Sequence, residues 1–192
     1  MDAVERAMAL IPRTGFLPPD QRPHAHRDSP CPIGYGQTNS QPRTVADMLR
    51  LLSVSPGHRV LDVGSGSGWT TALLAELTGP NGSVYGVERV PELVRRSRAA
   101  LDAFSMPWAG IHGAQDGVLG IPEAGPYDRI LVSAQAETLP QGLVGQLGEN
   151  GIMVIPVAGE MLRACRPPGS PAGSGADVQI TTHGRYRFVP LR

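Results

Sequence analysis

The sequence predicts an α/β fold in which a mostly parallel sheet carries helices on both faces. From residue 59 onward, short apolar segments alternate with segments of helical period, which is the pattern of successive strand-helix units. A glycine-rich turn directly follows the first of these apolar segments. Of the 192 residues, 41% are hydrophobic, which is enough for one well-buried core.

The regular elements can be placed in chain order from the spacing of apolar residues. We expect helices at residues 2–10, 43–52, 69–77, 91–104 and 140–147. Pro91 and Pro140 suit the first turn of a helix, where no N–H donor is needed. Buried strands are expected at residues 60–63, 83–87, 130–134 and 152–157, with a weaker strand at 109–112.

Three segments lack a clear pattern of this kind. Residues 11–42 are rich in proline and show no apolar period, so they form either a long ordered loop or a disordered arm. Residues 166–175 have the composition of a turn or mobile loop. Residues 178–190 supply two candidate strands, which we expect to pair antiparallel.

Composition and overall charge argue against several classes of partner, although a local basic patch stays open. Lys plus Arg equals Asp plus Glu at 17 each, so no electrostatic footprint for nucleic acid or an anionic membrane is expected. The opening segment lacks the apolar stretch of a signal peptide, and no later run approaches a membrane span. Cys31 and Cys165 have no partner at metal-ligand or redox spacing, which suits a cytoplasmic protein without a metal. The sequence carries no signal for an oligomeric state, and we expect a monomer.

The glycine-rich turn spans residues 60–69 and reads VLDVGSGSGW. Glycines allow a sharp turn and close backbone approach to a ligand, while the following helix offers free N–H groups. Trp69 stands where a dinucleotide fingerprint needs its third glycine, and no Gly-Lys-Ser/Thr follows, so NAD and ATP are disfavoured. A merely flexible turn is the alternative.

Two carboxylates flank this turn. Glu88 ends the next strand, twenty residues beyond Gly68, where it would meet the hydroxyls of a ribose. Asp62 precedes the glycines and adds negative charge near a cationic group of the ligand. S-adenosylmethionine has both sulfonium and ammonium groups. We therefore expect it to bind at a site whose residues are Asp62, Gly64, Ser65, Gly66, Gly68 and Glu88.

Residues 32–42 carry the most specific motif, PIGYGQTNSQP. It resembles the signature PIGxGQTISQP of the protein-L-isoaspartate (D-aspartate) O-methyltransferase family. Order and spacing agree along nearly the whole chain. Further matches are Ala7-Met8, Ile11-Pro12-Arg13, Phe16-Leu17-Pro18, Asp116-Gly117, Pro126-Tyr127-Asp128, Pro140 with Gln146-Leu147, and Phe188-Val189-Pro190-Leu191.

The resemblance implies a Rossmann-like S-adenosylmethionine-dependent methyltransferase fold with a seven-stranded sheet. It implies methyl transfer to the carboxylate of isoaspartyl residues in damaged proteins or peptides, with S-adenosyl-L-homocysteine as the other product. The family's active-site serine falls at Ser40 and its companion hydroxyl at Thr38. Its cofactor-binding pairs fall at Glu88 with Arg89 on the ribose side and at Asp116 with Gly117 on the adenine side.

The whole chain, residues 1–192, is expected to be one methyltransferase domain. Residues 1–42 would supply the N-terminal helix and a loop that covers substrate and cofactor. Residues 43–165 would form the cofactor-binding core, and residues 166–192 the final loop and strands.

Several positions depart from the family pattern. Asn39 replaces the usual isoleucine, Gln115 a glycine, and Glu160 a glutamine, while residues 25–28 replace a segment that usually carries tyrosine. Two alternatives to isoaspartyl repair therefore stay open: methylation of an ordinary aspartate or other carboxylate in a dedicated peptide, and a catalytically impaired S-adenosylmethionine-binding homologue. A nucleic-acid methyltransferase is disfavoured because no Asn/Asp-Pro-Pro-Tyr/Phe segment is present.

The expected chemistry needs no general base, because a carboxylate with an ordinary pKa of about 4 is ionised at neutral pH. The hydroxyls of Thr38 and Ser40 would hold this carboxylate in line with the methyl group. A simpler interpretation is that both hydroxyls only cap the helix that begins near Arg43.

Overall fold

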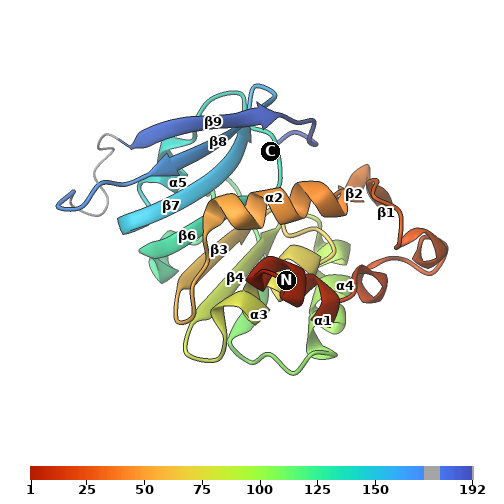
Figure 1. Cartoon of the computed structure of the whole chain (residues 1–192). Coiled ribbons are helices and arrows are strands. Elements are labelled where there is room, and N and C mark those ends of the chain that lie inside the picture. Colours follow the sequence, from red (N-terminus) through yellow and green to blue (C-terminus); the bar gives the residue numbers. More distant parts are fainter. Residues whose placement is uncertain (171–177, 192) are drawn as a thin grey trace.

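The computed structural model of the protein describes residues 1–170 and 178–191. Its main sheet has seven strands in the order β5-β4-β3-β6-β7-β8-β9. Figure 1 labels the run from β4 to β9. The first five strands of that order run parallel, and β8 and β9 are antiparallel additions. The predicted α/β class with a mostly parallel seven-stranded sheet is therefore confirmed. The strands are β3 (Arg59–Val63), β4 (Ser83–Glu88), β5 (Ala109–Gly113), β6 (Tyr127–Val132), β7 (Leu147–Val157), β8 (Glu160–Cys165) and β9 (Gln179–Arg185).

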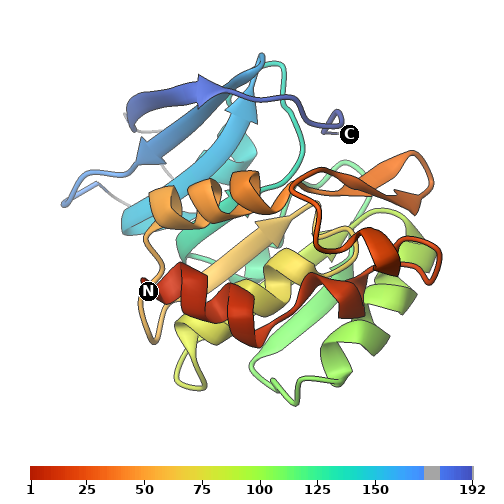
Figure 2. The same cartoon turned by 45° about the vertical axis from the view of Figure 1, so that its right-hand side comes forward.

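Helices cover the sheet unequally. One face carries α1 (Ala3–Leu10), α2 (Pro42–Leu52), α3 (Trp69–Thr78) and α4 (Pro91–Asp102). The other face is covered by the short helix α5 (Gln141–Val144) and by the segments that connect the strands. In Figure 2, α1 lies across α3 in front of the sheet, and the two helices are in contact. Among the described residues, no helix has both the length and the apolar character to cross a membrane.

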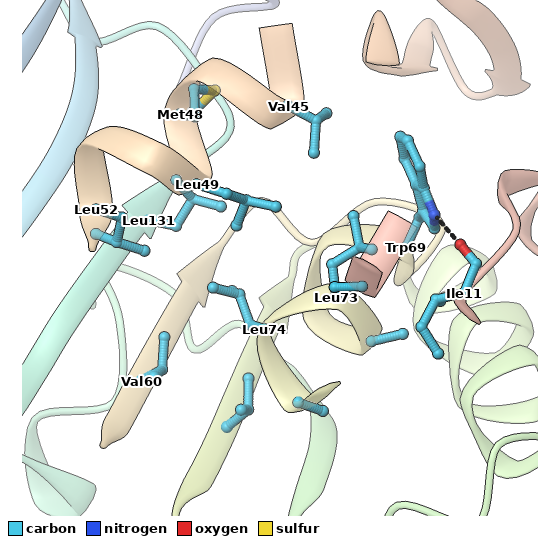
Figure 3. Packing of buried hydrophobic residues seen from close by; sticks show 14 of the residues in the cluster. Ile11, Val45, Met48, Leu49, Leu52, Val60, Trp69, Leu73, Leu74 and Leu131 are labelled. Carbon is cyan, nitrogen blue, oxygen red and sulfur yellow. Dashed lines mark hydrogen bonds between the residues drawn. The ribbon is translucent and has the colours of Figure 1, made fainter. Parts of the chain in front are cut away.

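Alternate residues of each central strand belong to different cores, because successive side chains of a strand point to opposite faces. Val60 packs with the helices of one face, and Leu61 packs in the cluster on the other. Figure 3 shows Leu49 of α2 and Leu74 of α3 in the first cluster, together with Val60 and Leu131 from the sheet. The glycine-rich turn therefore leaves a strand that is buried on both sides.

The C-terminal third of the sheet differs from the sequence prediction. Residues 178–190 form one strand, β9, and not two. Its antiparallel partner is β8, which the sequence did not predict because its burial does not alternate cleanly. The expected helix at 140–147 is confined to Gln141–Val144, because Gln146 turns its side chain to the carbonyls of Leu119 and Gly142 and β7 begins at Leu147. Residues 171–175 of the expected loop lie outside the described residues.

The N-terminal arm takes the ordered form of the two that the sequence allowed. It contains the short 3-10 turns η1 (Arg13–Phe16) and η2 (Arg22–His24) and the hairpin of β1 (Cys31–Gly34) and β2 (Gln37–Asn39). Figures 1 and 2 both place this hairpin beyond the amino end of α2. The motif PIGYGQTNSQP is thus a hairpin that leads directly into a helix.

Candidate active site

The glycine turn, residues 64–68, lies where the order of strands reverses. Strand β3 has β4 on one side and β6 on the other, and ligands of open α/β sheets bind outside the carboxyl ends of strands at such a point. Gly64, Gly66 and Gly68 have φ values of +76°, +55° and +87°. Residues other than glycine rarely adopt such positive φ values, so the path of the backbone requires glycine at these three positions. The turn is fixed to β4 because the N–H groups of Gly64 and Ser65 both donate to the carbonyl of Val87.

Glu88 reaches the glycine turn, as its spacing predicts. Its Oε2 accepts a hydrogen bond from the N–H of Gly66 at 3.0 Å, and its Oε1 accepts one from Val90 at 2.8 Å. The carboxylate is 6% exposed. Each carboxylate oxygen can accept further hydrogen bonds, so capacity remains for the two hydroxyls of a ribose.

A cavity of about 400 Å³ opens beside Glu88 at the carboxyl ends of β4 and β5. This volume lies within the range of small-molecule sites. The cavity is lined by Glu88, Arg89, Pro91, Val94, Arg95, Arg98, Gly113 and Ala114. The structure thus brings Arg89 together with Glu88, whereas Asp116 and Gly117 lie exposed in the loop that follows.

Asp62 is fully buried below the start of α3. The hydroxyls of Thr70 and Thr71 both donate to its Oδ2 at 2.7 Å. Burial raises the pKa of the Asp62 carboxyl to about 6; the nearby charge of Glu88 acts in the same direction, and the two threonine hydrogen bonds oppose it. Within the described residues, its Oδ1 is a buried atom without a hydrogen-bond partner, and so is the hydroxyl of Ser65.

These unpartnered atoms bear on the kind of ligand that the turn fits. An unpaired buried acceptor is destabilising unless a donor reaches it. The ammonium group of an amino-acid ligand is such a donor. The residues at the turn therefore fit the predicted cofactor, S-adenosylmethionine, at both its ribose and its amino-acid end.

The acceptor loop, residues 37–41, presents its side chains alternately. Thr38 is exposed and Ser40 is half-buried, while Asn39 between them is 6% exposed. Because side chains alternate along an extended chain, the hydroxyls of Thr38 and Ser40 lie on one side and the Asn39 amide on the other. Asn39 is therefore directed into the protein, and not beside the two hydroxyls.

The start of α2 is capped by a residue from the arm. Asp28 accepts a hydrogen bond from the N–H of Arg43 at 2.9 Å and another from the Gln41 amide at 3.0 Å. These bonds lower the pKa of the Asp28 carboxyl. Over residues 1–170 and 178–191, the hydroxyls of Thr38 and Ser40 make no hydrogen bond to α2, so capping does not account for them.

Arg13 is a site residue to which the sequence assigned no role. It is 5% exposed, and its guanidinium donates to the carbonyls of Asn39 and Ser40 at 2.9 Å each. Its Nε donates to Asn39 Oδ1 at 2.6 Å. Twenty-six residues separate Arg13 from Asn39, and no spacing rule links positions so distant.

Among the described residues, no group of three or more His, Cys, Asp or Glu side chains could hold a metal ion. The site offers hydroxyls, backbone N–H groups and the carboxyl groups of Asp62 and Glu88, beside a cavity that three arginines also line.

Comparison with known proteins agrees with this geometry. The family model of protein-L-isoaspartate(D-aspartate) O-methyltransferase matches residues 1–192. The chain is 49% identical over 192 residues to a protein-L-isoaspartate O-methyltransferase of Aeropyrum pernix, covering 98% of this chain and 72% of that protein. It is 40% identical to one of Methanocella arvoryzae, covering 96% and 95%.

A solved structure resembles the fold over its whole length. It is a Plasmodium falciparum protein assigned to protein-L-isoaspartate O-methyltransferase and solved in complex with S-adenosyl-L-homocysteine. It superposes with a TM-score of 0.83 at 28% identity and covers 100% of this chain and 91% of that one. By sequence over its full length and by fold, the chain belongs to the protein-L-isoaspartate(D-aspartate) O-methyltransferase family.

Proposed function

We propose that this protein methylates the free α-carboxylates of isoaspartyl residues in damaged proteins and peptides, with S-adenosylmethionine as the methyl donor. One observation carries the proposal: the Thr38 and Ser40 hydroxyls share one side of a loop whose opposite side is bonded to the glycine turn. An acceptor-binding loop and a nucleoside-binding turn are thus parts of one site. Membership of the family supports this reading.

Binding of the cofactor is assigned to the residues around the turn. Glu88 would accept the ribose hydroxyls, with Arg89 beside it in the cavity, and Asp116 and Gly117 would close the adenine side. Asp62 and Ser65 have buried oxygens available for the amino-acid end. Gly64, Gly66 and Gly68 let the backbone approach closely. When bound, S-adenosylmethionine supplies an electrophilic methyl group on a sulfonium sulfur.

The acceptor needs positioning more than activation. An isoaspartyl carboxylate is ionised at neutral pH, so no residue has to remove a proton. The hydroxyls of Thr38 and Ser40 would donate to one carboxylate oxygen and leave a lone pair of the other free to attack. Neutral donors hold the carboxylate without removing its nucleophilicity as strongly as a guanidinium would. Arg13 does not take that role, because its N–H groups are held by backbone carbonyls and by Asn39.

The product explains how methylation serves repair. The methyl ester carries a methoxy group that can leave as methanol, whereas a free carboxylate has no comparable leaving group. The neighbouring backbone nitrogen can therefore displace methanol and close a succinimide ring, whose hydrolysis returns some of the chain to aspartate.

The test compares two synthetic peptides that differ only in an isoaspartyl or aspartyl linkage at one position. We expect methyl transfer from labelled S-adenosylmethionine to the isoaspartyl peptide and none to the aspartyl peptide. The transfer is measured as the labelled methanol that base releases from the methyl ester. If the protein prefers the aspartyl peptide, its function is methylation of an ordinary aspartate and not isoaspartyl repair. Tight S-adenosyl-L-homocysteine binding without transfer to either peptide would identify a catalytically impaired homologue, and transfer to RNA or DNA instead would overturn the proposal.

We further propose that the protein works in the cytoplasm as a monomer. Cys31 and Cys165 are both free thiols, Cys31 being buried, which suits a reducing compartment. The zero net charge supports the absence of a nucleic-acid partner. Light scattering of the purified protein would show one chain per particle, and a dimer would contradict this part.

A further inference from the structure

Asn39 joins two parts of the site through its side-chain amide. Its Oδ1 accepts a hydrogen bond from Arg13 Nε at 2.6 Å, and its Nδ2 donates to Ser67 Oγ at 2.9 Å. Ser67 belongs to the glycine turn, and Asn39 to the acceptor loop. A single buried side chain therefore bonds the segment that would hold the acceptor to the segment that would hold the cofactor.

Arg13 fixes the backbone on either side of this link. Its guanidinium donates to the carbonyls of Asn39 and Ser40 and, from the rest of the arm, to those of Ser29 at 2.9 Å and Arg27 at 3.3 Å. It also lies 5.7 Å from the centre of the Trp69 ring. Burial lowers the pKa of this guanidinium, the expected effect where a charge is surrounded by neutral acceptors.

The hairpin is also seated on the glycine turn by packing. A methyl group on Gly66 would come within 3.3 Å of Ile33 Cδ1, and Arg96 of α4 donates to the Ile33 carbonyl at 3.1 Å. Ile33 thus connects the hairpin by direct contacts to both the glycine turn and α4. Within residues 1–170 and 178–191, one side-chain hydrogen bond joins the acceptor loop to the turn, and it is that of Asn39 to Ser67.

An apolar residue at position 39 would break this link. It would leave Arg13 Nε without its acceptor and Ser67 Oγ without its donor, both in a buried setting where unpaired polar groups are destabilising. Isoleucine, the usual residue at this position of the signature that the motif resembles, could make neither hydrogen bond.

We propose that Asn39 is a positioning residue that couples ligand binding at the glycine turn to the placement of the Thr38 and Ser40 hydroxyls. The inference deepens the proposed function and rests on it for the identity of the acceptor. Coupling between two binding sites is reciprocal, so a bound acceptor peptide must tighten cofactor binding by the factor that cofactor tightens peptide binding. Removal of the link reduces that factor.

The experiment uses the full chain and measures S-adenosyl-L-homocysteine affinity by calorimetry, with and without a saturating isoaspartyl peptide. In the wild-type protein the peptide should tighten the affinity about fivefold or more. Asn39→Ala and Ser67→Ala should each bring this ratio below about twofold, and the double variant should lower it no further, because both remove one hydrogen bond. Asn39→Asp should keep the ratio, because its carboxylate accepts from both Arg13 and the Ser67 hydroxyl.

A second readout does not depend on the peptide. S-adenosyl-L-homocysteine should slow amide hydrogen exchange at residues 37–41 in the wild-type protein and in Asn39→Asp, but not in Asn39→Ala or Ser67→Ala. The matched control is Asn81→Ala, an exposed asparagine before β4 at the opposite end of the sheet, which should behave as wild type. If Asn39→Ala does not fold, Ser67→Ala, which deletes one oxygen atom, decides the question.

The outcomes separate this inference from the proposed function. The inference is overturned if Asn39→Ala or Ser67→Ala keeps both the wild-type ratio of S-adenosyl-L-homocysteine affinities and the wild-type hydrogen exchange. It is also overturned if the ligand has no effect on exchange at residues 37–41 in the wild-type protein. The protein could instead show ligand-dependent hydrogen exchange that requires Asn39 and yet methylate no isoaspartyl peptide. That result would support the coupling and contradict only the proposed isoaspartyl substrate.

Discussion

Ser40 has a backbone that is held independently of its hydroxyl. Its carbonyl accepts a hydrogen bond from Arg13 at 2.9 Å, so removal of the side-chain oxygen should leave the acceptor loop in place. The hydroxyl makes no hydrogen bond to any other described residue, so it can serve an acceptor carboxylate. This separation makes Ser40 a sharper test of the chemistry than residues that also hold the fold.

Ser40→Ala is expected to lower kcat/KM for an isoaspartyl peptide about 10- to 100-fold, the range for one hydrogen bond to a charged group. Its affinity for S-adenosyl-L-homocysteine should stay unchanged, whereas Glu88→Ala should lose that affinity. Steady-state kinetics and calorimetry check both. Ser55→Ala, at an exposed serine far from the site, is the control. Wild-type turnover in Ser40→Ala would refute the role of Ser40.

Asp62 gives the protein a pH dependence of defined sign. The folded protein holds its proton up to a pKa of about 6, against 3.8 for the ordinary carboxyl. Because the folded state then binds more protons than the unfolded chain, the contribution of Asp62 to the free energy of unfolding decreases as pH rises from about 4 to 6. Asp2 and Asp28, whose pKa values are lowered, act in the opposite direction at lower pH.

The measurement is therefore a difference between two proteins. Without ligand, the stability of Asp62→Asn relative to wild type should increase between pH 4.5 and pH 7 in urea unfolding, because the variant has no buried carboxylate to ionise. Asp102→Asn, at an exposed residue near the end of α4, should show no such trend. An equal difference at both pH values would show that Asp62 does not titrate in this range.

At the scale of elements, α3 and α4 approach each other closely at Gly68. This residue is the N-cap of α3 and has a φ of +87°, and a Cβ placed on it would lie 3.0 Å from the Cβ of Ser97 in α4. Gly159 has nearly the same φ, +88°, but open space around it. Comparing alanine substitutions at Gly68 and Gly159 therefore distinguishes the cost of backbone strain from the cost of disturbed helix packing.

Both Gly68→Ala and Gly159→Ala should lose about 1 to 2 kcal/mol of unfolding free energy through the left-handed backbone. Gly68→Ala should lose more, because α4 has to move, and it should also weaken S-adenosyl-L-homocysteine binding. Adding Ser97→Gly should recover much of that excess in a double-mutant cycle. Equal losses in the two alanine variants would argue against close packing at Gly68.

How far the sequence predicts these elements depends on how local their causes are. Strands β3, β4, β6 and β7 follow from apolar runs, and α2 and α4 from helical spacing and proline at the first turn. The sequence does not predict strand β8, because its residues show no regular alternation of buried and exposed positions. Their burial, including that of the half-buried Arg163, is set by the pairing of β8 with β7 and β9. The β1–β2 hairpin has too few apolar residues for a periodic signal.

The site shows the same division. The glycine turn and Glu88 are separated by a fixed strand-helix-strand unit, so their meeting was predictable. The inward direction of Asn39 and its contact with Arg13 and Ser67 were not, because they depend on how a distant arm packs. Asp28 as the cap of α2 has the same origin.

At the scale of the whole molecule, the sheet divides two large hydrophobic clusters, one on each of its faces. Leu74 of α3 is fully buried in one of them, and Leu143 of α5 is fully buried in the other. Every central strand contributes side chains to both clusters, so neither can lose its packing alone. Residues 1–192 are therefore predicted to unfold as one cooperative domain.

Leu74→Ala and Leu143→Ala should each lower the free energy of unfolding by about 2 to 5 kcal/mol. Both variants should shift one and the same transition, observed by calorimetry and by circular dichroism. Two transitions, each sensitive to only one of the substitutions, would show that the two sides of the sheet unfold separately.

The contact of Arg13 with Trp69 has an optical consequence. The chain contains two tryptophans, Trp69 and Trp108. Trp69 is buried under the arm, with its indole N–H bonded to the Ile11 carbonyl, as Figure 3 shows, while Trp108 is bonded to Ala75 of α3. In Trp108→Phe the tryptophan fluorescence would come from Trp69 alone. Any loosening of the N-terminal arm would expose the Trp69 indole to water and shift its emission to longer wavelength. The fluorescence of Trp69 would thereby report on the packing of the N-terminal arm without an added label.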